Sequence, residues 1–129
     1  MAYLHSKGIF VFTAPYNAAA QLAYMENDAV ISAIVGSASC LVFGADQVIL
    51  DFDWDETKKF SFSTLERCVE KLGATREQFN DTCLLAGASV LPTFPDLDVD
   101  SNKAKIDSAR MLLQRSHNDA VAACVSSML

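Results

Sequence analysis

Short apolar runs rich in β-branched and aromatic residues alternate with helix-forming segments along the first two-thirds of the chain. The runs that predict buried strands cover residues 8–13, 29–35, 40–44 and 48–52. Helical patterns cover residues 16–26, 63–73 and 75–87. Because parallel strands need crossover connections, which are usually helices, this alternation predicts an α/β fold with a mostly parallel sheet flanked by helices.

A loop rich in proline and aspartate, residues 91–100, divides the sequence into two unequal parts. We expect residues 1–95 to form the core and residues 96–129 a C-terminal helical extension that is truncated. Helical segments are predicted over 101–115 and 120–129. The 129 residues are 51% hydrophobic, which is enough for one domain to bury a core.

The charge balance limits the classes of partner. Ten Lys and Arg residues stand against sixteen Asp and Glu, giving a net charge of -6. This disfavours non-specific nucleic-acid binding, which depends on clustered positive charge. No apolar run is long enough to span a bilayer and no export signal opens the chain, so a cytoplasmic location without membrane contact is expected.

Cysteine and histidine positions do not predict a metal site. The cysteines lie far apart, without the CxxC or CxH spacing of zinc ligands, at Cys40, Cys68, Cys83 and Cys124. We expect reduced, mostly buried thiols. A Cys-His nucleophile pair has no local motif in its favour.

Functional residues of an α/β sheet lie at the carboxyl ends of its strands, and three stretches there resemble the flap-endonuclease/XPG family. Residues 14–23 (APYNAAAQLA) resemble its APxEAEAxxA stretch. Residues 35–44 (VGSASCLVFG) are similar to (T/S)xDxDxLxFG, and residues 78–89 (QFNDTCLLAGAS) to QFxDxCILxGxD. The three occur in the same order and belong to the family's internal, PIN-like domain.

The resemblance implies a nuclease site built on carboxylates, which hold two Mg²⁺ ions for phosphodiester hydrolysis. In this chain the matched positions are Asn17, Ala19, Ser37, Ser39 and Ser89. None carries a charge, and Mg²⁺ relies on carboxylates among its few protein ligands. The sequence therefore predicts a degenerate site with no catalytic residue, no metal ion and no other cofactor.

We expect two further elements of the family to be missing. Its amino-terminal strand would precede residue 1, and its DNA-gripping hairpin would follow the third stretch, where this chain has PTFPD at residues 92–96. This pattern is similar to the Mkt-type post-transcriptional regulators of fungi. That similarity implies a non-catalytic protein-interaction scaffold in messenger-RNA and translation regulation, with an ataxin-2-like poly(A)-binding-protein-binding partner and indirect contact with mRNA. The missing strand predicts self-association through an uncovered sheet edge.

Two other functions remain open. A residual metal-dependent, structure-specific nuclease could recruit Asp46 or Asp51, and an RNA-binding module could use a local basic patch. Trp54, Phe60 and Phe62 flank an acidic segment, where exposed aromatic side chains would form a protein-interaction surface. Packing of the same rings in the core, beneath the following helix, is an equally good interpretation.

Overall fold

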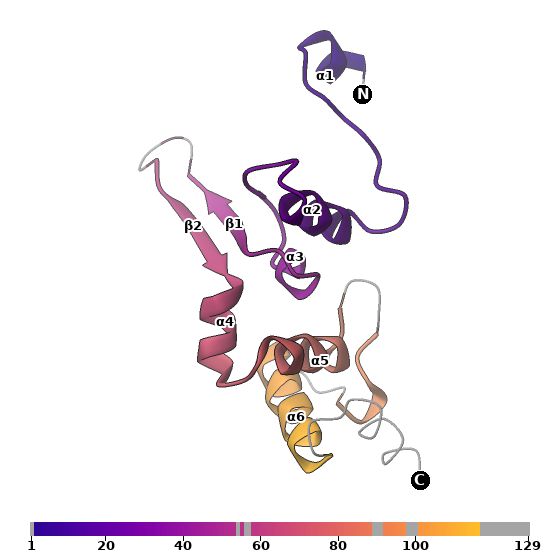
Figure 1. Ribbon diagram of the computed structural model, residues 1–129, viewed down its shortest axis with the longest axis vertical. Helices are drawn as coiled ribbons and strands as arrows, with labels where there is room; N and C mark the ends of the chain where they lie inside the picture. Colours follow the sequence, from indigo (N-terminus) through magenta and orange to yellow (C-terminus); the bar gives the residue numbers. More distant parts are fainter. Residues whose placement is uncertain (1, 54, 56–57, 89–91, 98–100, 117–129) are drawn as a thin grey trace.

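A computed structural model of the chain describes residues 2–53, 55, 58–88, 92–97 and 101–116 (Figure 1). Its elements are, in chain order, α1 (Ala2–Ser6), α2 (Ala18–Asn27), α3 (Ser39–Val42), β1 (Gln47–Phe52), β2 (Phe60–Thr64), α4 (Leu65–Leu72), α5 (Arg76–Ala86), the 3-10 turn η1 (Pro95–Leu97) and α6 (Asn102–Arg115). The chain is mixed α/β, as the sequence predicts. Within the described residues, no helix is both long and apolar enough to cross a membrane.

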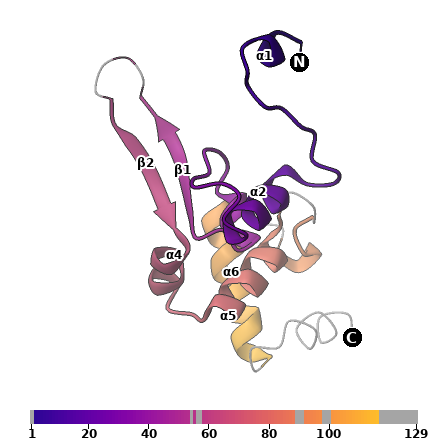
Figure 2. The same ribbon diagram turned by 45° about the horizontal axis from the view of Figure 1, so that its top comes forward.

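Residues 2–16, which we call the N-terminal arm, lead to α2, and α1 at the start of the arm stands away from the other elements in both views (Figures 1 and 2). The prediction of a strand over residues 8–13 is wrong. The segment lies outside the strands of the structure, and the Ile9 N–H donates to the carbonyl of Leu4. Phe10 is 82% exposed. A strand is stable only where a neighbour satisfies its backbone groups, and the described residues place none beside this segment.

Helix α2 begins at Ala18, two residues later than the helix predicted over 16–26. Its N-cap is Asn17, whose extended backbone and side-chain acceptor satisfy the N–H of Ala20. The predicted end is confirmed, since the helix finishes at Asn27 and the Asp28 N–H bonds to the carbonyl of Tyr24.

The two strands predicted between α2 and β1 do not form. From 29–35, only Val35 pairs, in a single parallel bridge with Ile49. The segment 40–44 forms the end of α3 and a turn instead. The Ser37 hydroxyl accepts the Ser39 N–H at the start of α3, and the helix buries Cys40 and Leu41.

β1 and β2 form an antiparallel hairpin (Figure 1). β1 matches the predicted strand at 48–52, and after the acidic segment the chain returns as β2, a strand absent from those predicted, which pairs along β1. The pairs include Ile49 with Phe62 and Phe52 with Phe60, with a bulge between Ile49 and Asp51. The mostly parallel sheet stays a prediction: the Val35 bridge is the one parallel pairing among the described residues.

Helices α4 and α5 confirm their sequence signals. Thr64 caps the start of α4, and Gly73 ends it in the left-handed conformation at φ 61°. Thr75 and Gln78 form a capping box at the start of α5, within the helix predicted over 75–87, with both reciprocal hydrogen bonds present.

Two clusters of buried side chains hold these elements together. The larger joins α2, α3, β1 and α4 through Ala23, Ile34, Cys40, Leu41, Ala45, Val48 and Leu65. The smaller joins α5, η1 and α6 through Leu85, Leu97, Ala109 and Leu113. Figure 2 shows α6 against α5, so the helix predicted at 101–115 is confirmed and packs on the core segment. The domain boundary at residue 95 stays a prediction, and the segment 120–129 lies outside the described residues.

Candidate functional site

The first matched stretch places Asn17 and Ala19 at the start of α2. The side-chain oxygen of Asn17 accepts the Ala20 N–H at 3.0 Å. Ala19 is half-buried and packs against the larger core cluster. A depression of about 200 Å³ beside them is lined by Pro15, Tyr16, Asn17, Ala20, Gln21 and Tyr24, none of which is a carboxylate. This end of the site therefore offers an amide and apolar surface.

The second stretch places Ser37 and Ser39 at the start of α3. Their hydroxyl oxygens are 3.0 Å apart, and the Ser39 N–H donates to the Ser37 hydroxyl at 3.2 Å. The Cys40 N–H donates to the carbonyl of Ser37. These polar atoms satisfy the free N–H groups at a helix start, which is a structural task for a serine.

The first two matched stretches lie on neighbouring helices, since α2 packs against α3 in the larger cluster. Ser89 lies outside the described residues. The convergence of all five matched positions in one cleft therefore stays a prediction.

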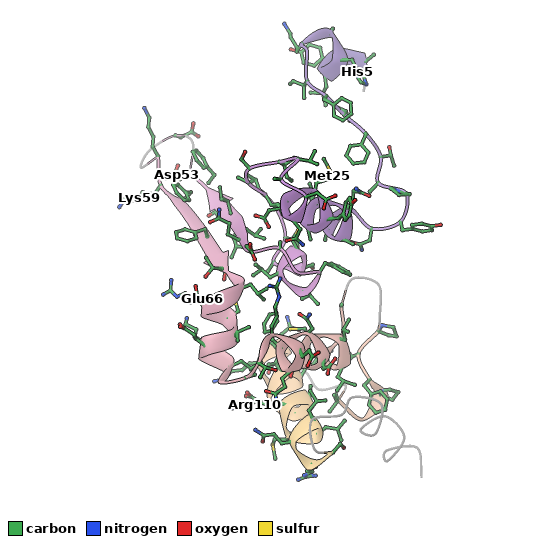
Figure 3. All side chains as sticks on the ribbon, viewed as in Figure 1. His5, Met25, Asp53, Lys59, Glu66 and Arg110 are labelled. Atoms are coloured by element: carbon green, nitrogen blue, oxygen red, sulfur yellow. The ribbon has the colours of Figure 1, made fainter. Side chains whose placement is uncertain are left out.

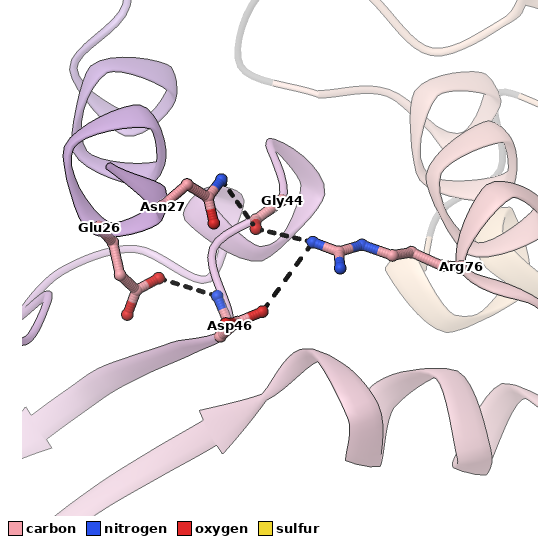
Figure 4. A network of polar contacts seen from close by, with 5 residues as sticks. All are labelled: Glu26, Asn27, Gly44, Asp46 and Arg76. Atoms are coloured by element: carbon pink, nitrogen blue, oxygen red, sulfur yellow. Dashed lines mark hydrogen bonds and ion pairs between the residues drawn. The ribbon is translucent and has the colours of Figure 1, made fainter. Parts of the chain in front are cut away.

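Residues that the alternative nuclease would recruit take part in other contacts. Figure 4 shows that the Asp46 N–H donates to the Glu26 carboxylate at 2.8 Å, while the Asp46 carboxylate lies 4.0 Å from the Arg76 guanidinium. The Asp51 carboxylate accepts the N–H of Phe52 at 2.9 Å. In the part of the chain that the structure describes, no three His, Cys, Asp or Glu side chains gather closely enough to hold a metal ion.

The network around Gly44 joins α2, the turn before β1, and α5 (Figure 4). The Gly44 carbonyl accepts from Arg76 at 2.9 Å and from Asn27 at 3.5 Å. The turn needs a glycine, because φ is +95° there. Sequence reasoning misses this network, because Arg76 lies 32 positions from Gly44 and no local pattern links them.

Of the aromatic residues singled out in the sequence, Phe60 and Phe62 are 54% and 51% exposed, so packing beneath α4 is not their role. Their ring centroids are 6.0 Å apart, and the Phe60 ring stacks on Phe52 at 6.3 Å. The register puts all three rings on the face opposite the buried Val48. We call Phe52, Phe60 and Phe62 the aromatic face; Trp54 lies outside the described residues.

The described thiols are free, and the histidine is remote from them. Burial raises the pKa of the Cys40 thiol. Burial, with a smaller contribution from nearby Cys68, raises the pKa of Cys83 to about 11. His5 lies on α1, away from these elements (Figure 3). Thiols with raised pKa values are poor nucleophiles, and the arrangement does not assemble a Cys-His pair from these residues.

Comparison with known proteins gives the following relationships. The sequence pattern described as the XPG I-region matches residues 8–89. The post-transcriptional regulator MKT1 of Saccharomyces cerevisiae is 36% identical over 101 residues, which cover 77% of this chain and 12% of that protein. The post-transcriptional regulator mkt1 of Schizosaccharomyces pombe is 31% identical over 121 residues, covering 74% of this chain and 15% of the relative.

A relative with a nuclease name is also similar. Exonuclease 1 of Oryza sativa subsp. japonica is 26% identical over 111 residues, covering 83% of this chain and 13% of that protein. The chain thus spans about an eighth of the length of the relatives that it matches.

Proposed function

The chain belongs to the XPG I-region family, and from that premise we propose that it is the nuclease-like domain of a post-transcriptional regulator, a protein-interaction scaffold that does not cut nucleic acid. Two relatives carry the name of post-transcriptional regulator. Because the chain spans a small part of them, the regulatory role is a proposal about the protein to which this domain belongs.

The observation that carries the non-catalytic role is the chemistry of the matched positions. Asn17 and Ser37 contribute neutral oxygens that accept helix N–H groups, Ser39 contributes a hydroxyl bonded to that of Ser37, and Ala19 contributes a methyl group. Hydrolysis by two metal ions needs negatively charged protein ligands, which hold both divalent ions beside the substrate phosphate. Neutral helix caps do not supply that charge.

The aromatic face supports the scaffold role. Exposed aromatic side chains that are held rigidly by stacking and strand pairing are the usual anchors of protein interfaces. We propose this face as the binding surface for an ataxin-2-like poly(A)-binding-protein-binding partner in the cytoplasm, with mRNA reached through that partner.

The fold of the intact protein is part of the same proposal. In a PIN-like domain β1 would belong to a mostly parallel sheet. The parallel bridge between Val35 and Ile49 supports this arrangement, because it pairs β1 in parallel on the side away from β2.

A residual nuclease is the second candidate, and the similarity to Exonuclease 1 favours it. It would have to use Asp46 or Asp51, whose carboxylates already have an ion-pair or backbone partner. An RNA-binding module is a weaker alternative, because the net charge of -6 opposes phosphate contacts.

Cleavage assays separate scaffold from nuclease. We expect no Mg²⁺- or Mn²⁺-dependent cleavage of flap, hairpin or single-stranded substrates. Metal-dependent cleavage that Asp46→Asn or Asp51→Asn abolishes would replace the scaffold with the nuclease. RNA binding would show as an affinity that falls steeply with salt.

Binding to a purified ataxin-2-like protein tests the surface. We expect Phe60→Ser with Phe62→Ser to weaken binding at least tenfold, the loss of a typical aromatic hot spot. Phe10→Ser is the matched control, since Phe10 is equally aromatic and lies on the N-terminal arm. Equal loss in the control would remove the aromatic face from the proposal.

A further inference from the structure

The two strands of the hairpin differ in how many neighbours they have. β1 lies between β2 and the segment 34–36, which contributes the parallel bridge at Val35. β2 pairs with β1 on one side, and its other edge faces away from the rest of the chain in both views (Figures 1 and 2). β2 is therefore the outer strand of the described sheet.

Hydrogen bonds fix which groups point to that outer edge. The Ile49 N–H donates to Ile34 and the Ile49 carbonyl accepts from Gly36, each at 2.9 Å, so neither group faces β2. Its partner Phe62 is therefore in a non-hydrogen-bonded pair, and the N–H and carbonyl of Phe62 point away from β1. The Leu65 N–H donates inward to Asp46, as the same alternation requires.

The outer edge lacks the usual protection against pairing. Natural edge strands carry charges or proline that prevent another strand from adding. The sequence of β2, FSFST, has neither. Its outward-pointing positions are Phe60, Phe62 and Thr64, which alternate along the strand as a pairing partner needs.

We propose that a second copy of this chain pairs antiparallel with β2 at this edge, centred on Phe62, so that two hairpins form one continuous sheet across a two-fold axis. In that register the N–H and carbonyl of Phe62 bond to those of Phe62 in the second copy, and Phe60 lies opposite Thr64. This inference concerns the backbone edge and goes beyond the proposed scaffold function.

Charge complementarity selects a second copy over an unrelated strand. The same register brings Lys58, just before β2, to the level of Glu66 in the first turn of α4 of the second copy. Both side chains are exposed, and the two-fold axis repeats the pair. The chain therefore supplies both the strand and the opposite charges from its own sequence.

Sedimentation analysis of the full chain over a range of concentrations tests the backbone pairing. We expect a monomer–dimer equilibrium in the wild type. Phe62→Pro removes an N–H that points away from β1 and pairs with no described residue, so it should leave the far-ultraviolet circular dichroism unchanged and abolish the dimer. Phe62→Val removes the ring but keeps the N–H, and should still dimerise. A monomeric wild type, or equal loss in both variants, overturns the proposal.

Exchanging the charges of Lys58 and Glu66 provides a second test, which does not require β2 to accept a proline. Lys58→Glu and Glu66→Lys should each weaken the dimer about tenfold, because each turns two attractive pairs into repulsive ones. The double variant restores opposite charges across the axis and should recover the wild-type dissociation constant. Additive weakening in the double variant would contradict the register.

Discussion

Two segments of similar composition adopt different structures in this molecule: one is an exposed, irregular segment and the other is a paired strand. Residues 9–13 (IFVFT) and β1 (QVILDF) are both short and rich in β-branched and aromatic side chains. In β1, Val48 is fully buried and the backbone pairs on both sides. In the arm, Phe10 is 82% exposed and the segment pairs with no described strand.

The difference lies in the neighbours, because intrinsic β-propensity is similar in the two segments. β1 is held by the bridge at Val35 on one side, by β2 on the other, and by the core beneath Val48. The N-terminal arm has the same side chains without these contacts. A β-forming sequence becomes a strand only where other parts of the chain supply its hydrogen bonds and cover its apolar face.

Truncating one buried and one exposed apolar side chain should give the largest contrast. Ile34 is 1% exposed and lies beside β1, so Ile34→Ala should lower the free energy of unfolding by about 2–5 kcal/mol. Phe10→Ala should change it by less than about 0.5 kcal/mol. Urea denaturation measures both. A comparable loss for Phe10→Ala would mean that the arm packs in solution.

The packed helices should also lose stability at alkaline pH, through Cys83 on α5. Burial raises the pKa of the Cys83 thiol to about 11 from its ordinary 9.0. Between these values the unfolded chain releases the proton and the folded chain keeps it, so stability is complete below pH 9 and falls as pH rises.

We expect a loss of about 1–2 kcal/mol by pH 11, since partial exposure reduces the full effect. Denaturation midpoints from pH 8 to 11 measure it, with Cys83→Ala as the control that should lack this component. An identical pH slope in that variant would assign the loss to other groups.

Asn17 marks the junction between the arm and the packed helix, and its substitution should have a smaller effect. Asn17→Ala removes the acceptor for the Ala20 N–H and should cost about 1 kcal/mol. Asn17→Asp keeps an acceptor, places negative charge at the helix start, and should stay within a few tenths of wild type. Thermal or urea unfolding distinguishes them. Equal destabilisation by both would show that the amide N–H₂ matters more than the cap.

Local signals in the sequence predict the helices well. Gly73, the Thr75–Gln78 capping box and the Ser101 cap act over three or four residues, so the sequence specifies them directly. The strands are predicted less well. The segment 40–44 has a strand-like composition, but it lies in α3 and the turn after it, where Cys40 and Leu41 pack into the larger cluster. β2 is visible only through its pairing with β1.

The candidate site also has a part that the sequence predicts and a part that only the structure shows. The sequence identifies the uncharged positions Asn17, Ser37 and Ser39, and the structure adds what their polar atoms bind. The exposure of Phe60 and Phe62 and the contacts of Arg76 with the Gly44 turn depend on segments distant in the sequence. No spacing rule encodes such contacts, so the three-dimensional structure is needed to find them.

The central claim, that the nuclease site of this domain holds no metal, is tested most directly by thermal unfolding with and without Mn²⁺. The comparison variant restores charge by Asn17→Glu, Ala19→Glu, Ser37→Asp, Ser39→Asp and Ser89→Asp. Mutual repulsion of the carboxylates should lower its melting temperature without metal, and Mn²⁺ should raise it by several degrees by binding the folded state. The wild-type chain should melt at the same temperature with and without Mn²⁺. Stabilisation of the wild type by Mn²⁺ to the same extent as the variant would contradict the claim.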